Sequence, residues 1–143
     1  IKSKNEIKLI KKICNIAGLA FSKVPKFASS GDSLISISKQ FTKKLLDFGA
    51  DYVPYLAVAA GHAGYCDIIS PPNEKKVETG DILILDTGAT FKGYFCDFDR
   101  NFSFGKPNKD IAEAYRLAQR VSESAQLGVA QSAEQASAAP SYN

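Results

Sequence analysis

Two apolar stripes near the start of the chain recur at steps of three and four residues and predict helices. The first predicts a helix over residues 4–22 and consists of Ile7, Ile10, Cys14, Ala17 and Phe21. A second helix is predicted from a cap at Asp32 or Ser33 to a stop at Gly49. Its stripe consists of Leu34, Ile37, Phe41, Leu45 and Phe48. The chain therefore opens with a pair of amphipathic helices.

The middle of the chain carries the patterns of strands. Residues 52–60 are aromatic, β-branched and small, and Pro54 interrupts them, which favours a strand that begins late or lies at a sheet edge. Glycines and prolines then indicate an irregular loop over residues 61–72. Residues 82–85 are apolar on both faces, so we expect a central, doubly covered strand that ends at Asp86. Residues 90–104 alternate aromatic and polar positions and predict one or two further strands.

The last part of the chain changes in composition. A helix is predicted from Asn108 or Asp110 through about Arg120. Residues 121–143 contain no lysine or arginine and are rich in alanine, serine and glutamine. We therefore expect one domain over residues 1–120, followed by residues 121–143 as either a helix extension or a disordered tail that need not be native to it. Because the first residue is Ile and the chain contains no Met, we expect a piece of a longer protein.

Composition narrows the class of protein. A chain of 143 residues with 45% hydrophobic content can bury one core. The cysteines are odd in number and widely spaced, which favours a reduced cytoplasmic location; they are Cys14, Cys66 and Cys96. No apolar run reaches the roughly 18–20 residues of a membrane helix, so no membrane partner is expected. Residues 1–46 hold ten lysines against Glu6 and Asp32, but without interleaved arginines or aromatics they indicate solvated helix faces rather than a nucleic-acid surface.

Three carboxylates follow or flank the expected central strand: Asp86, Asp97 and Asp99. If residues 91–92 form a two-residue hairpin turn, Asp86 lies directly opposite Asp97. Like charges in that position destabilise a sheet unless a cation or a shared proton intervenes, so the pair favours a divalent metal site. Asp99 has the parity of Asp97 and would join them unless a bulge turns it away. The alternative is that all three are solvent-facing, and Cys96 is expected in the core rather than as a ligand.

The sequence Gly-Asp-Ile-Leu-Ile-Leu-Asp-Thr-Gly over residues 80–88, followed by Gly93-Tyr94, Asp97 and Arg100, resembles the metal-binding hairpin of the pita-bread metallopeptidases. This M24-type family includes methionine aminopeptidase, Xaa-Pro aminopeptidase and dipeptidase, and creatinase. The eleven-residue step from Asp86 to Asp97 is the spacing of the family, and the likeness extends from residue 2 to about residue 120. It implies an α+β fold, the N-terminal half of a pita-bread catalytic domain, with two N-terminal helices and a mainly antiparallel sheet followed by a helix.

The resemblance also implies the metals and the residues that hold them. Asp86 would chelate one of two divalent ions, which are manganese, cobalt, iron or zinc in the family, and Asp97 would bridge both. Thr87, Gly88 and Tyr94 would support the hairpin rather than react. Asp99 stands where the family commonly has threonine, so it is a possible neighbour of the ligands.

A histidine that contacts substrate in the family falls, by count, at Ile68 in this chain. His62, the only histidine, lies in the same loop and is the candidate for that catalytic role. The remaining family ligands, one histidine and two glutamates, have no place after residue 120. We therefore expect this chain alone to bind divalent ions weakly or not at all and to lack turnover.

The function implied for the intact protein is dinuclear metal-dependent hydrolysis of an N-terminal peptide bond, with Xaa-Pro peptides as substrate. One alternative is a creatinase-like hydrolase of a small non-peptide molecule, and another is a non-catalytic binding module whose lysine-rich helices are the working surface. The missing C-terminal half of the domain is the expected partner. Without that half, the exposed sheet edge predicts self-association.

Overall fold

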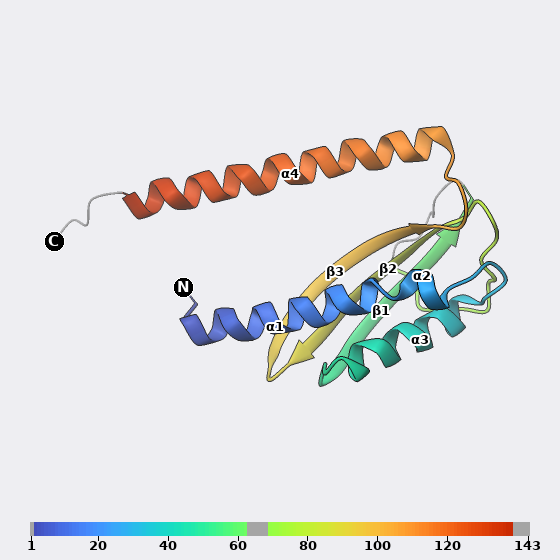
Figure 1. Cartoon of the computed structure of the whole chain (residues 1–143), viewed down its shortest axis with the longest axis horizontal. Helices are drawn as coiled ribbons and strands as arrows, with labels where there is room; N and C mark the ends of the chain where they lie inside the picture. Colours follow the sequence, from blue (N-terminus) through green and yellow to red (C-terminus); the bar gives the residue numbers. More distant parts are fainter. Residues whose placement is uncertain (1, 63–68, 139–143) are drawn as a thin grey trace. The chain divides into compact units, whose positions relative to one another are not determined.

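A computed structural model describes residues 2–62 and 69–138, with residues 126–138 described as backbone only (Figure 1). The chain divides into two compact units, one ending at Pro107 and one beginning at Asn108. The first unit contains α1 (Lys4–Phe21), α2 (Val24–Phe27), α3 (Leu34–Asp47), β1 (Tyr52–Gly61), β2 (Ile82–Phe91) and β3 (Tyr94–Ser103). The second contains α4 (Lys109–Ala138).

Both predicted N-terminal helices are confirmed, and side-chain caps define where they begin. Ser3 and Glu6 form a capping box at the start of α1, in which each side chain accepts a hydrogen bond from the other residue's backbone N–H. Ser33 caps α3 by accepting a hydrogen bond from the N–H of Ser36 at 3.2 Å. Asp32, the other candidate cap, instead accepts from the N–H of Ser29. The chain leaves α3 through Gly49, whose φ of 103° suits glycine.

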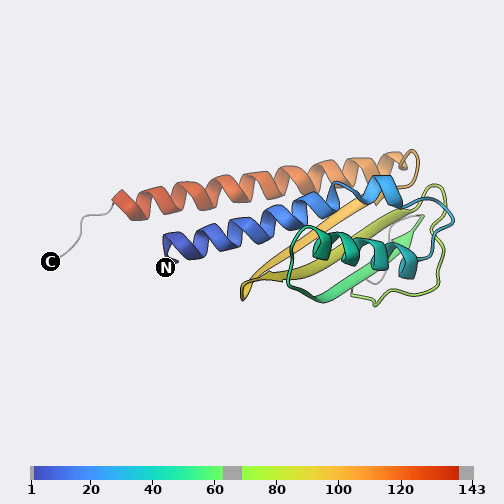
Figure 2. The ribbon, with the colours of Figure 1, turned by 60° about the horizontal axis from the view of Figure 1, so that its bottom comes forward.

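The three strands form one antiparallel sheet in the order β1-β2-β3, so β2 is the central strand as expected. The helices α1 and α3 cover one face of this sheet (Figure 2). Between the helices and that face lies the core, where Ile13, Phe41, Leu83 and Leu85 are fully buried. Cys96 is buried in the same core, which confirms its predicted position. The expected α+β architecture of two helices on an antiparallel sheet is thus confirmed.

The predicted hairpin register is wrong by one position. The turn between β2 and β3 consists of Lys92 and Gly93, not Phe91 and Lys92, and Phe91 pairs with Tyr94. Lys92 and Gly93 have φ values of 50° and 79°, and a two-residue turn with two positive φ values matches the twist of a hairpin. Placing Gly93 inside the turn supplies the residue that tolerates this conformation, and it leaves the aromatic Phe91 in the strand.

The end of one strand and the end of one helix also differ from the prediction. Asp86 is the fifth residue of the ten in β2 and lies mid-strand, because hairpin pairing continues to Phe91. The helix expected to stop near Arg120 continues as α4 to Ala138, since alanine, glutamine and glutamate favour helix. The proposed domain boundary at residue 120, with a helix extension or a tail after it, stays a prediction. Within residues 2–62 and 69–138, no helix combines the length and the apolarity that crossing a bilayer requires.

Candidate metal centre

The three aspartates lie on the face of the sheet that α1 and α3 do not cover. Asp86 pairs directly with Asp99, and Asp97 pairs with Gly88, two residues further along β2. Directly paired residues share a face, as do residues two apart in a strand, so Asp86, Asp97 and Asp99 point to the same side. The pairing of β2 with β3 is continuous, without a bulge. The predicted direct opposition of Asp86 and Asp97 is therefore wrong, because the turn is shifted, but the two remain diagonal neighbours.

Tyr55 of β1 joins the two candidate ligands. Its hydroxyl lies 2.5 Å from Oδ1 of Asp97 and 3.3 Å from Oδ1 of Asp86. Tyr55 pairs with Gly88, so its ring has to cross the central strand to reach Asp97 on β3. One hydroxyl therefore brings together carboxylates from two strands.

Gly88 makes this crossing possible. A Cβ atom at Gly88 would lie 2.2 Å from Cζ of Phe95 and 2.6 Å from Cε1 of Tyr55, far inside van der Waals contact. The two rings occupy the space above Gly88 with their centroids 6.3 Å apart. The sequence pattern does not identify Tyr55 as a neighbour of the aspartates, because the register of β1 against β2 cannot be counted across the long segment between these strands.

Whereas Gly88 lies on the aspartate face, two of the predicted supporting residues, Thr87 and Tyr94, lie on the other face. Thr87 is fully buried there and donates a hydrogen bond of 3.0 Å from Oγ1 to the carbonyl oxygen of Tyr55. It therefore ties β2 to the backbone of the residue that contacts both carboxylates. Tyr94 begins β3 opposite Phe91 and also faces the helices, where its side chain interacts with Glu6. Tyr94 supports the hairpin without approaching the aspartates.

The structure does not bring His62 to the carboxylates. Its exposed ring lies against Gly80, and a Cβ atom added to Gly80 would lie 2.4 Å from Cε1 of His62. His62 is five residues along the chain from Ala57, the partner of Asp86. At about 3.3 Å per residue this is an offset of roughly 16 Å along the sheet. Ile68, which falls at the family's histidine position, lies outside the described residues.

The electrostatics of the aspartate face oppose full ionisation. Burial raises the pKa of Asp86 above the usual range of aspartate, and the charges of Asp97 and Asp99 raise it further, whereas the hydrogen bond from Tyr55 lowers it. Burial likewise raises the pKa of Tyr55, as does its hydrogen bond to Asp97, so the hydroxyl keeps its proton. A hydroxyl carries one proton and can donate it to only one carboxylate at a time. The single hydroxyl of Tyr55 therefore cannot satisfy both carboxylates, and the aspartate face keeps an excess of negative charge.

We expect Asp86→Asn to stabilise the metal-free chain at neutral pH. The pKa of Asp86 is higher in the folded chain than in the unfolded chain, so its carboxyl favours folding at acid pH. This contribution is lost as the pH rises through the folded-state pKa. Removing the charge should raise the free energy of unfolding at pH 8 by up to about 1 kcal/mol, as for opposed like charges in a sheet.

Chemical denaturation at pH 8 and at acid pH measures this effect, and the gain should shrink as the pH falls. Asp47→Asn is the matched control, because Asp47 accepts hydrogen bonds from Lys43 at the surface. That substitution should lower stability slightly. A loss of stability in Asp86→Asn at pH 8 would contradict the charge conflict.

The donor set fits a divalent ion, although it is incomplete. Carboxylate oxygens are ligands that manganese and similar hard cations prefer. The ion pairs found among the described residues join Asp47 to Lys43 and Lys44, so no lysine or arginine neutralises the aspartate face. Within the same described residues, no three histidine, cysteine or acidic side chains converge closely enough to hold a metal. The aspartates thus supply part of a site and need further ligands.

Comparison with known proteins places these features in a family. Residues 8–136 match metallopeptidase family M24. The chain is 31% identical over 130 residues to the uncharacterized peptidase YqhT of Bacillus subtilis, covering 91% of this chain and 36% of that protein. Among solved structures, it is similar to a Xaa-Pro dipeptidase from Bacillus anthracis, with 34% identity and a TM-score of 0.74 over 81% of this chain and 33% of the other.

A prolidase from Thermococcus sibiricus is similar in the same way. It shares 29% identity and a TM-score of 0.80, and the match covers 87% of this chain and 34% of the prolidase. The chain thus spans about a third of the length of the relatives it matches.

Proposed function

This chain belongs to metallopeptidase family M24, and from that premise we propose that its hairpin supplies one half of a dinuclear metal site in a hydrolase. The observation that carries the proposal is the shared contact of Tyr55 with Asp86 and Asp97. Two acidic side chains from neighbouring strands are held together on an open face, without a protein cation between them. Such an arrangement favours divalent cations as the missing partners.

Each residue of the face has a distinct proposed role. Asp86 and Asp97 would hold the metal ions, which supply a Lewis acid and a means to activate water when bound. Tyr55 would orient Asp97 by donating its hydrogen bond and would itself stay protonated. Asp99, paired with Asp86, would add negative charge beside the ions and influence which metal is preferred. The identity of the ions, manganese, cobalt, iron or zinc, belongs to the proposal.

We propose that the substrate of the intact protein is a peptide, with Xaa-Pro peptides as the first candidate. Support comes from the similar solved structures, which include a Xaa-Pro dipeptidase and a prolidase. Because the chain spans about a third of such proteins, the remaining metal ligands would come from a longer chain. Turnover is therefore proposed for the longer protein and not for these 143 residues alone. Self-association through the exposed sheet edge and a reduced cytoplasmic location remain part of the same proposal.

The position of His62 favours a second candidate, a creatinase-like hydrolase of a small non-peptide molecule. Family members place a substrate-contacting histidine upstream of the hairpin, whereas His62 lies about 16 Å along the sheet from Ala57, the partner of Asp86. A different loop residue would then contact the substrate. The two candidates share the metal site and differ in the bond that is cleaved.

Calorimetric titration of the 143-residue chain with Mn²⁺ tests the metal site. We expect weak, saturable binding that depends on the aspartates. Assays of a longer protein that completes the site, with a Xaa-Pro dipeptide and with creatine, then separate the two substrate classes. Absence of Mn²⁺ or Co²⁺ binding in both proteins would contradict the proposal.

Tyr55→Phe is expected to weaken Mn²⁺ binding by roughly 10-fold, as is typical when a partner of a metal ligand is lost. The substitution leaves the ring above Gly88 and removes only the hydroxyl that contacts both carboxylates. Tyr52→Phe is the matched control, since Tyr52 lies at the start of β1, three residues before Tyr55, and is 62% exposed. Equal affinities in the two variants would remove Tyr55 from the proposed site.

A further inference from the structure

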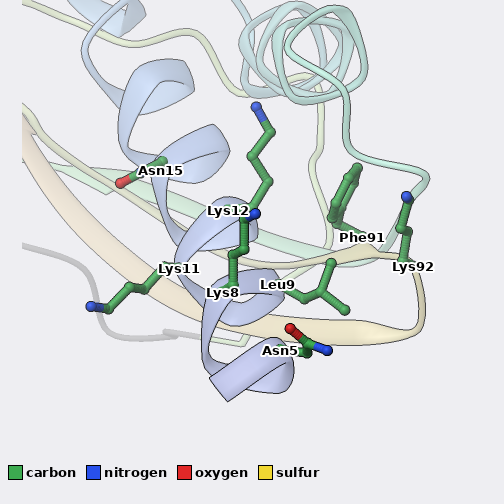
Figure 3. Close-up of a pocket in the computed structure, with 8 residues that line it drawn as sticks. All are labelled: Asn5, Lys8, Leu9, Lys11, Lys12, Asn15, Phe91 and Lys92. Atoms are coloured by element: carbon green, nitrogen blue, oxygen red, sulfur yellow. The ribbon is translucent and has the colours of Figure 1, made fainter. Parts of the chain in front are cut away.

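A basic groove lies between α1 and the tip of the β2–β3 hairpin, away from the aspartate face. It has a volume of about 750 Å³. Figure 3 shows Lys8 and Lys12 extending from α1 on the side of Phe91 and Lys92. The residues that line the groove are Asn5, Lys8, Leu9, Lys11, Lys12, Asn15, Phe91 and Lys92.

The lysines of this groove are placed against the local electrostatics. Lys11 and Lys12 lie three and four residues after Lys8 on one helix, a spacing at which like charges repel. The last turn of α1, where a basic residue would suit the helix dipole, has none. Repulsion among these lysines opposes the stability of the helix, so their clustering indicates a role other than stability.

Nearby acids do not relieve this conflict. The ion pairs found in the described part of the chain join Lys43 and Lys44 to Asp47 on α3. Glu6 accepts the backbone N–H of Ser3, and Asp51 accepts the backbone N–H of Lys92 at 2.6 Å. Neither carboxylate forms an ion pair with a lysine of the groove. The ammonium groups there are available to an external anion.

The floor of the groove is apolar. Leu9 is partly buried, and Phe91 is a partly buried residue packed against the core. The Lys92 ammonium lies 5.7 Å from the centroid of the Phe91 ring. The groove therefore offers an apolar strip with cations beside it.

We propose that this groove binds an extended acidic segment of a partner protein. An apolar side chain of the segment would contact Leu9 and Phe91, and carboxylates on either side of it would pair with Lys8, Lys12 and Lys92. The lining runs along α1 from Asn5 to Asn15, about 15 Å at 1.5 Å per residue, which matches four or five residues of extended peptide.

The groove suits an acidic peptide better than a nucleic acid. It contains no arginine, the residue that best matches phosphate geometry. Its one aromatic ring is partly buried and has a lysine over it, whereas binding of single-stranded nucleic acid relies on freely accessible rings for stacking. The apolar strip would contribute nothing to binding a phosphate backbone.

Fluorescence anisotropy with a labelled peptide tests the inference, using a central Leu-Phe pair flanked by glutamates. We expect saturable binding to the 143-residue chain, weakened about 10-fold or more by the double variant Lys8→Glu/Lys12→Glu. This variant should remain folded, since both positions are exposed on α1 and glutamate favours helix. The matched control, Lys26→Glu/Lys106→Glu, changes the net charge equally at exposed positions outside the groove and should alter the affinity by less than about 2-fold.

The apolar floor is tested separately by Leu9→Ser, which should weaken the peptide roughly 5-fold without changing its salt dependence. Three outcomes would overturn the inference. The peptide shows no saturable binding, or both double variants weaken it equally, or a single-stranded oligothymidylate binds more tightly than the peptide and loses that affinity in Lys8→Glu/Lys12→Glu. None of these readouts depends on metal binding or hydrolysis, so they test peptide binding independently of the proposed function.

Discussion

Asp97→Asn is expected to weaken Mn²⁺ binding by the chain at least about 10-fold, and to lower turnover about 100-fold or more in a longer protein that completes the site. Asparagine preserves the size of the side chain, and its amide oxygen can still accept the hydrogen bond from Tyr55. It lacks the charge and the second anionic oxygen that a ligand shared by two ions requires. The loss should therefore appear in metal binding and not in folding.

Calorimetric titration with Mn²⁺ and circular dichroism of the metal-free chain measure the two properties separately. Asp51→Asn is a suitable control, because Asp51 accepts a hydrogen bond from the backbone N–H of Lys92 at the hairpin tip, away from Tyr55. It should bind Mn²⁺ as tightly as the unaltered chain. If Asp97→Asn and Asp51→Asn bound Mn²⁺ equally well, the assignment of Asp97 as a metal ligand would be wrong.

Gly88→Ala is expected to destabilise the chain by about 1–3 kcal/mol and also to weaken Mn²⁺ binding, by up to roughly 100-fold. The added methyl group would meet the rings of Phe95 and Tyr55 at 2.2–2.6 Å. Those contacts involve the far ends of two side chains, so the rings have to swing away while the strand pairing persists. Displacing Tyr55 separates its hydroxyl from Asp86 and Asp97.

The same substitution at Gly18 provides the control. Gly18 lies in α1, and no atom lies within 4 Å of the place that an added methyl group would take, so alanine there should stabilise the chain by about 0.5–1 kcal/mol. Denaturation curves should thus shift in opposite directions for the two variants. Adding Tyr55→Phe to Gly88→Ala should produce little further loss of Mn²⁺ affinity, because both act through one hydroxyl. Fully additive losses would show that Gly88 acts by another route.

Local patterns carry most of the information about the elements of this fold. The stripe over α3 predicts a helix because a period of three to four residues buries one face against the sheet, as Phe41 shows. The helix α1 is also correct, but its predicted face is partly wrong, since Ile13 and Ile16 are buried and Ile7 is 42% exposed. Residues 82–85 are apolar on both faces of β2, which predicts a central strand, and their side chains are buried on both faces of the sheet. Cys96 was likewise assigned to the core by strand parity alone.

The hairpin marks the limit of such local rules. The acidic face was predictable for any two-residue turn, since shifting such a turn by one residue changes the partner of Asp86 by two and keeps Asp86, Asp97 and Asp99 on one side. The register depended on one position of the turn, which Lys92 and Gly93 settle through their positive φ values. A shift of one residue in the turn changes every cross-strand partner by two positions.

What the sequence by itself determined is the family motif, the elements and the face on which the three aspartates lie, because these depend on spacing within a few residues. Only the tertiary structure decided that Tyr55 contacts both Asp86 and Asp97, that Gly88 provides room for it, and that His62 lies elsewhere. The contacts of Tyr55 join β1 to residues 31 and 42 positions later in the chain. The register across such a connection is set by packing and hydrogen bonds between strands, which no local pattern encodes.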